Sequence, residues 1–118
     1  MTVHARLGLA VVLVAVVGVL LLLVARSRPG MMPMVRVFVR LCAAAAGLQA
    51  VIGLVLLATG DRPSQWLHLF YGAATVVPVP IAERYARNSP ARDATLVLLV
   101  GAAAMVLFGI RAITTGSA

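Results

Sequence analysis

Hydrophobic positions along the chain fall into four long runs that contain no charged side chain. These runs cover residues 7–25, 41–60, 66–82 and 94–110. A helix rises about 1.5 Å per residue, and crossing a hydrocarbon core about 30 Å thick takes roughly 17–25 apolar residues, so each run is long enough. The first run has no polar face, although a helix in a soluble bundle carries a polar stripe. The pattern predicts an all-α integral membrane four-helix bundle with spans at about 5–25, 38–59, 65–83 and 94–114.

The residues between and within the runs predict two antiparallel helical hairpins joined by a tight turn. In that turn Gly60 ends the second helix, Pro63 cannot continue it, and Ser64 suits the N-cap of the third. The third run contains Pro78 and Pro80. Each proline removes a backbone donor and crowds the preceding turn, so we expect the third helix to be kinked there. The kink shapes packing or, alternatively, forms a transport hinge.

Composition supports one membrane-embedded unit. Hydrophobic residues make up 63% of the chain and charged residues 11%. The spans and short loops use up the length, so we expect a single four-span transmembrane domain, residues 1–118, whose first partner is the lipid bilayer. The first run is longer than the roughly 7–15 residues of a signal-peptide core, and we expect it to be retained. The single cysteine, Cys42, excludes an intrachain disulfide and a thiolate metal cluster.

The basic residues, all arginine, are unevenly distributed between the two sides of the predicted membrane. One side carries Arg26, Arg28, Arg36, Arg40, Arg84, Arg87 and Arg92, whereas the other carries Arg6, Arg62 and Arg111. Short loops rich in arginine face the cytoplasm, which predicts both termini on the outer side of a plasma or inner membrane. Because these arginines bracket the spans and form no continuous patch, nucleic-acid binding is not expected.

Small residues indicate which helix faces pack together. The second run carries Gly47 and Gly53, and the fourth carries Gly101. Small residues let helix backbones approach closely in lipid, so these three glycines are the predicted packing face. The first run is mostly valine and leucine. We therefore expect the second, third and fourth helices to form the tightly packed unit and the first to be more exposed to lipid.

Few polar groups fall inside the predicted spans. Gln49 and Thr75 both lie near the middle of adjacent antiparallel helices, which predicts an interhelical hydrogen bond between them or, alternatively, a pair that binds a ligand. The three acids, Asp61, Glu83 and Asp93, fall at the predicted helix ends. Proton-coupled transporters need an ionisable group within the membrane, so this placement argues against a proton-driven exporter.

A second polar cluster is predicted at the outer ends of the spans. It joins His68 and Tyr71 with Arg111, Asp61 and Arg62. One interpretation is an interfacial salt bridge between Arg111 and Asp61, with His68 capping a helix. The other is that His68 ligates a metal or haem while Arg62 and Arg111 hold an anionic group.

A third candidate is a copper site. Met31, Met32 and Met34 precede Cys42, and thioethers suit Cu(I). Methionine is also a common residue that fills gaps in apolar packing, which is the alternative interpretation.

A further pattern runs from Leu48 through Gln49 and Gly53 to Leu54, and then includes Pro63 and Leu67-His68-Leu69. This pattern resembles part of the haem A synthase family. The resemblance covers about residues 47–74. It implies one four-helix half of such a protein, with His68 as an axial ligand of haem near the outer face. The family's Glu-x-x-His-Arg signature is absent, and no second histidine lies within the runs. The resemblance therefore implies haem binding by one histidine, or by a pair completed in a dimer, rather than haem oxidation.

No nucleophile triad, phosphate loop or paired metal-binding spacing is present, so we expect no enzymatic activity and no cofactor. The first hypothesis is a structural or accessory membrane subunit that packs with itself or with a larger complex. The second is a haem-binding membrane protein that uses His68. The third is a small transporter.

Overall fold

The computed structural model describes residues 3–60 and 66–117, and the described residues form helices and no strand. The elements are α1 (Val3–Ser27), the short 3-10 helix η1 (Pro29–Met31), α2 (Met32–Ala58), α3 (Leu67–Val76), α4 (Pro78–Arg87) and α5 (Ala91–Ser117). They run along one long axis in a body of 46 × 23 × 18 Å. The all-helical fold class is thereby confirmed.

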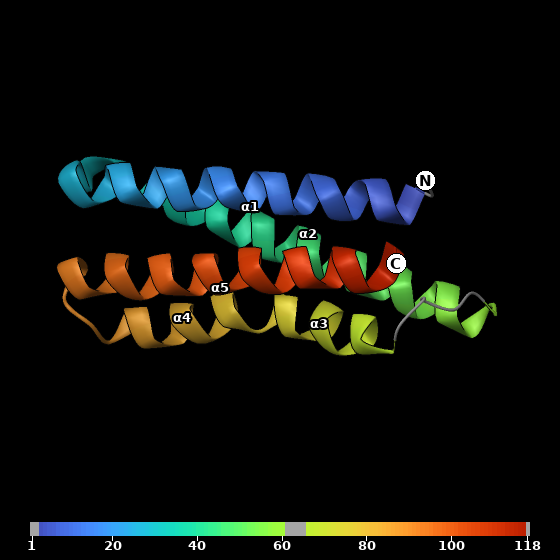
Figure 1. Ribbon diagram of the computed structural model, residues 1–118. Helices are drawn as coiled ribbons and strands as arrows, with labels where there is room; N and C mark the ends of the chain where they lie inside the picture. The colour runs from blue at the N-terminus through green and yellow to red at the C-terminus, as the bar shows by residue number, and fades with distance from the viewer. Residues whose placement is uncertain (1–2, 61–65, 118) are drawn as a thin grey trace.

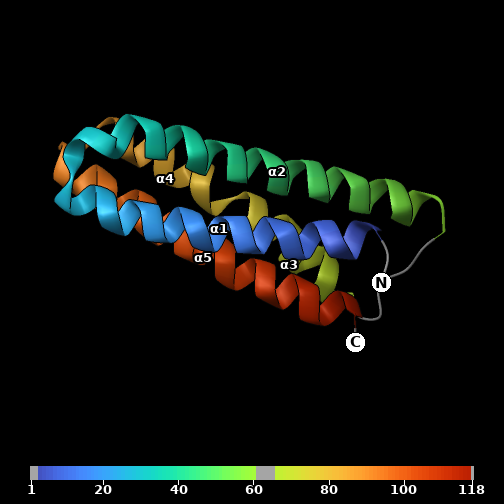
Figure 2. The same cartoon turned by 90° about the horizontal axis from the view of Figure 1, so that it is seen from above.

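Helix α2 runs opposite to α1, α3 and α4 follow one another in the direction opposite to α2, and α5 runs back again (Figures 1 and 2). Helix α5 packs against α1 on one side and against α3 and α4 on the other, while α2 packs mainly on α1. The start of α1, the end of α2, the start of α3 and the end of α5 lie at one end of the body, which we call the terminal end (Figure 1). The connections 28–31 and 88–90 lie at the other end, which we call the loop end.

Within residues 3–60 and 66–117, three helices are long and apolar enough to cross a membrane: Val3–Ser27, Pro29–Ala58 and Asp93–Thr115. The predicted third span differs, because two ten-residue helices, α3 and α4, occupy it. Pro78 cannot donate to the carbonyl of Ala74, which accepts instead from Val77 at 3.4 Å. The helix therefore breaks at Val77, where the proline pair predicted a kink.

Burial differs from the expected division between the helices. Helix α1 buries Val12, Ala15, Gly18, Leu22 and Ala25 at helical spacing. Because this stripe packs against α2 and α5, the interpretation of α1 as the lipid-exposed helix is wrong. Within an apolar stretch of 18 residues in each long helix, the buried share is 11% in α2, against 22% in α1 and 33% in α5.

The loop end of α2 supplies all of that helix's buried residues, Val35, Val39, Cys42 and Ala46. Beyond Ala46 no residue of α2 is buried, and Leu48 and Leu54 are 63% and 62% exposed. Helix α2 is therefore packed more closely against its neighbours over its first half than over its second.

Candidate functional site

Two groups of polar side chains join different helices. The first, the arginine–glutamate cluster, consists of Arg36 and Arg40 on α2 and Glu83 on α4, towards the loop end. The second, the histidine cluster, consists of His4, Gln49, His68, Tyr71 and Arg111, towards the terminal end. Each group joins residues that lie far apart in the sequence.

In the arginine–glutamate cluster, Arg40 donates from Nε and Nη2 to the two carboxylate oxygens of Glu83, both at 3.1 Å. This fork is the strong, directional form of an arginine–carboxylate pair. Arg36 Nη2 lies 3.7 Å from the same carboxylate. The Glu83 side chain is only 9% exposed, and those of Arg36 and Arg40 are 28% and 56% exposed.

Glu83 corrects the expectation that every acid falls at a helix end. Pro78 restarts the helix after the break, and α4 continues to Arg87, so Glu83 lies in the middle of α4. It shares the buried face of that helix with Val79, Ala82 and Ala86. This helical spacing, 79, 82, 83 and 86, was the sequence signal that could have identified a buried carboxylate.

Within the cluster, Arg36 is incompletely satisfied. Its Nε is buried and has no hydrogen-bond partner among the described residues. Each guanidinium carries five N–H donors, whereas one carboxylate offers two oxygens. The two arginines therefore retain donors and one net positive charge after Glu83 is paired.

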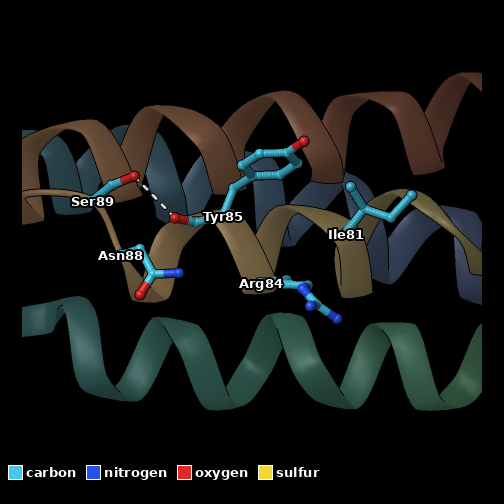
Figure 3. Close-up of a pocket in the computed structure, with 5 residues that line it drawn as sticks. All are labelled: Ile81, Arg84, Tyr85, Asn88 and Ser89. Atoms are coloured by element: carbon cyan, nitrogen blue, oxygen red, sulfur yellow. Dashed lines mark hydrogen bonds between the residues drawn. The ribbon is translucent and has the colours of Figure 1, made fainter.

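A surface depression adjoins these two arginines and is lined by Pro29, Met32, Pro33, Arg36 and Arg40. A second depression lies on α4 and the turn after it, lined by Ile81, Arg84, Tyr85, Asn88 and Ser89 (Figure 3). There the Ser89 hydroxyl donates to the Tyr85 carbonyl at 2.9 Å. Both depressions are open rather than enclosed.

The histidine cluster brings together the two histidines of the chain. The rings of His4 on α1 and His68 on α3 have centroids 6.1 Å apart and stand at 89° to each other. His68 Nδ1–H donates to the Ala112 carbonyl of α5 at 2.6 Å. His4 Nδ1 is buried and has no partner in the described part of the chain. His4 lies outside the apolar runs, as the sequence shows, but the structure places it beside His68.

His4 carries no sequence signal of its own because it precedes the first apolar run. Helix α1 begins at Val3, however, which places His4 one turn before that run and beside His68. The pairing follows from the length and direction of α1 and α3, which no local motif specifies.

Around the two rings, the predicted neighbours of His68 are present. The Arg111 guanidinium lies 5.4 Å from the centroid of the Tyr71 ring, a cation–π geometry. Arg111 precedes Ala112, the acceptor of the His68 bond. The remaining expected members, Asp61 and Arg62, lie outside the described residues.

Gln49 and Thr75 do not form the predicted hydrogen bond with each other. Gln49 Nε2 donates to the backbone carbonyl of His4, and Thr75 Oγ1 donates to the Tyr71 carbonyl at 2.7 Å. Because α2 packs mainly on α1, Gln49 meets α1 rather than α3. Thr75 satisfies its hydroxyl within its own helix, as threonine often does in apolar surroundings.

The predicted packing glycines have different surroundings. A Cβ placed on Gly101 would lie 2.7 Å from the Cβ of Ala82 and 3.1 Å from the carbonyl oxygen of Pro78, so α5 crosses α4 closely there. A Cβ on Gly53 would lie 3.3 Å from His4 Cε1. A Cβ on Gly47 would meet no atom within 4 Å, so this glycine has an open surface.

The methionines and Cys42 do not form a common site. Cys42 is buried, with its Sγ 3.7 Å from the Val14 carbonyl oxygen, and Met34 is 62% exposed. Met32 Sδ accepts instead from Thr95 Oγ1 at 3.7 Å. No group of three or more His, Cys, Asp or Glu able to hold a metal occurs among residues 3–60 and 66–117.

Comparison with models of known protein families, with curated proteins and with solved structures finds no match.

Proposed function

We propose that this chain is a multi-pass membrane protein without enzymatic activity that serves as a structural or accessory subunit, packing with itself or with a larger membrane complex. The observation that carries the proposal is the chemistry of the outward helix sides. Residues well exposed there include Leu13 and Leu20 on α1, Leu41 and Leu48 on α2, and Val100 and Leu107 on α5. A soluble bundle places polar residues at such positions, so lipid is the fitting environment.

In this proposal α3 and α4 together form one crossing, the third in chain order, and α5 forms the fourth. The two helices follow one another along the length of α5 (Figure 1). Proline breaks are tolerated in a crossing where neighbouring helices cover the freed backbone groups. The close crossing of α5 at Gly101, beside Ala82 and the Pro78 carbonyl, keeps the chain packed against α5 just after the break.

The accessory role rests on the second half of α2. Over this half no residue is buried, and Gly47 has open space where a Cβ would stand. A glycine on an apolar, open helix face permits close approach of another helix. We place the contact with a partner on this part of α2, around Gly47 and Leu48.

Membrane integration is tested by alkaline carbonate extraction of membranes that contain the full chain. We expect the protein to remain in the membrane pellet, because apolar helix sides hold it in the bilayer. Release into the supernatant would contradict the membrane location and everything built on it.

The accessory contact is tested by cross-linking in membranes. Leu48→Cys, made in a Cys42→Ala background, should cross-link to a second copy or to a larger partner. Leu13→Cys on α1 is the matched control, since Leu13 is 58% and Leu48 63% exposed. Absence of any adduct with Leu48→Cys, or equal adducts with both, would show that α2 carries no specific contact.

Orientation is tested separately. The loop end carries Arg26, Arg28, Arg84 and Arg87 in addition to the arginine–glutamate cluster. We place this end in the cytoplasm and both termini outside, following the distribution of arginines. A C-terminal reporter that is active only in the cytoplasm should stay silent, and an active reporter would reverse the orientation.

Haem binding is the second candidate function, and the observation that favours it is the pairing of His4 with His68. Ligating histidines usually donate their other ring N–H to a carbonyl, as His68 does to Ala112. The donor set therefore fits an iron with two imidazole ligands, and a bound haem would supply redox chemistry there. The two depressions described above, however, lie at the loop end and not beside the histidines, so haem binding is the second candidate.

An absorption spectrum of the detergent-purified chain, produced in haem-supplied cells, tests this second function. Haem ligation predicts a Soret band that both His4→Ala and His68→Ala abolish while helix content is retained. A protein without the band, or a band that survives both variants, would contradict ligation by this pair.

Buried Glu83 does not make transport the favoured function. Both oxygens of its carboxylate are engaged by Arg40, so Glu83 ties α2 to α4. A substrate-coupled carboxylate needs an oxygen open to a pathway, and the described residues show the opposite arrangement.

A further inference from the structure

We propose that the depression at the start of α2 binds the phosphate headgroup of an anionic phospholipid, with Arg36 and Arg40 as its ligands. The depression is lined by Pro29, Met32, Pro33, Arg36 and Arg40. This inference rests on the membrane location proposed above and adds a specific lipid partner to it.

The first argument is the unused hydrogen-bonding capacity of the two arginines. Arg40 spends Nε and Nη2 on Glu83, and Arg36 reaches the same carboxylate only at 3.7 Å. Arg36 Nε is buried without a partner among the described residues. A buried N–H without a hydrogen-bond partner costs free energy, and a guanidinium binds phosphate oxygens with directional hydrogen bonds.

The second argument is local charge. Glu83 is the acid that pairs with the two arginines, so the cluster keeps one net positive charge. The same depression lies at the beginning of α2, where the helix dipole is positive. Basic pockets of this kind on the cytoplasmic side of membrane helices suit anionic headgroups.

The third argument is depth. The charge-free part of α2 extends from Leu41 to Ala58, which at 1.5 Å per residue corresponds to about 27 Å, close to the thickness of a hydrocarbon core. Arg40 therefore lies at the boundary of that core, and Arg36 lies one turn further out, at the level of lipid phosphates. Free phosphate is dissolved in water, so its binding would not require arginines at the depth of the lipid headgroups.

The fourth argument identifies the lipid rather than free phosphate as the occupant. Next to the two arginines, Val37 and Leu41 are 53% and 63% exposed and continue the surface towards the terminal end. A phospholipid has the matching form, a charged phosphate followed by acyl chains. The second depression, on α4, is lined by a single arginine, Arg84, and its serine hydroxyl is already bonded within the turn (Figure 3).

The proposal is tested by titrating the full chain in a neutral detergent with phosphatidylglycerol and, separately, with phosphatidylcholine. Native mass spectrometry counts the bound lipid. We expect preferential binding of phosphatidylglycerol, and binding about fivefold weaker in Arg36→Gln, as one arginine near a headgroup contributes about a factor of five. Arg36→Gln leaves the Arg40–Glu83 fork intact, so the fold should be retained.

Two further variants separate the site from a diffuse positive charge and from a structural role. Arg87→Gln removes an exposed arginine at the same end that lines neither depression, and it should bind as the unmodified chain does. Glu83→Gln releases both guanidiniums and should strengthen phosphatidylglycerol binding several-fold. A purely structural cluster predicts no such gain.

Three results would overturn the inference. Equal binding of both lipids would show that no anionic site exists. Equal weakening in Arg87→Gln and Arg36→Gln would show a diffuse charge effect. Displacement of the lipid by inorganic phosphate at millimolar concentration would assign the site to free phosphate instead. Carbonate extraction of the same protein reports membrane location independently, so failure of either proposal is recognised separately.

Discussion

The two ends of the molecule hold their helices together by different means. At the loop end a charged fork, Arg40 to Glu83, joins α2 to α4, and α2 buries four residues beside it. At the terminal end the contacts are a histidine on a carbonyl, a glutamine on a carbonyl, two perpendicular rings and the cation–π contact of Arg111 with Tyr71. Here no residue of α2 is fully buried. An ion pair with fixed geometry accompanies close packing of α2, whereas single hydrogen bonds and ring contacts accompany its more exposed half.

This difference indicates which half of α2 is held by the chain's own helices and which half is open to another helix. The arginine–glutamate cluster fixes the position of α2 relative to α4, because these two helices otherwise have few contacts. The second half of α2 extends towards the terminal end (Figure 2), and its exposed side chains include Leu48, Leu54 and Val55. A mutation at each end should therefore have a distinct effect.

The largest effect is expected from Arg40→Leu. Glu83 is 9% exposed on its side chain and would keep only the 3.7 Å contact with Arg36. A buried charge that loses its partner is strongly destabilising. We expect the melting temperature in detergent to fall further than in Gly101→Ala or His68→Phe.

The reverse change, Glu83→Leu, should cost much less, because the freed arginine side chains can extend to the headgroup layer. The double variant Arg40→Leu/Glu83→Leu should recover most of the stability, since an apolar pair can replace a buried ion pair. Equal losses for Arg40→Leu and Glu83→Leu would contradict the burial of the carboxylate.

The next effect compares two glycines. Gly101→Ala forces a Cβ to within 2.7 Å of Ala82 and 3.1 Å of the Pro78 carbonyl oxygen, and overpacking of this kind costs about 1–3 kcal/mol. Gly47→Ala meets open space and should be neutral or stabilising by up to about 1 kcal/mol, the helix preference of alanine over glycine. Thermal unfolding of both variants measures the difference, and an equal loss in the two would place Gly47 in an internal contact.

Much of the fold could be predicted from the apolar runs, because run length alone specifies a helix that can cross a bilayer. The break before Pro78 was predictable from the missing backbone donor. The burial of one face of α1 was not predictable, because Ala15, Gly18 and Ala25 are small residues spread among leucines and valines. Their common face becomes visible only when helical spacing is followed along the whole helix.

The candidate site was predicted in part. The sequence predicted that His68, Tyr71 and Arg111 lie close together near the outer ends of the spans, and the structure places them together. It missed the bond of Gln49 to α1, since the order of helices around the bundle has no local signal. It missed Glu83 because a charged residue at the end of an apolar run looks like a helix end, although α4 continues beyond it.

A smaller effect is expected from His68→Phe. The change keeps a planar ring and removes the hydrogen bond to Ala112, which contributes about 1 kcal/mol. Melting temperature in detergent should fall slightly, and less than in Arg40→Leu. A larger fall than in Arg40→Leu would reverse the comparison between the two ends.

The smallest effect is expected from Gly53→Ala. The nearest atoms to a Cβ there are His4 Cε1 at 3.3 Å and Nε2 at 3.5 Å, the far end of a side chain that can rotate. The modest crowding and the helix preference of alanine oppose each other, so the free energy of unfolding should change by less than about 0.5 kcal/mol. The His4 ring should nevertheless move relative to His68, which changes the ring proton resonances of both histidines in an NMR spectrum. Unchanged resonances would separate His4 from Gly53, and a loss as large as that of Gly101→Ala would show that the terminal end is packed as closely as the loop end.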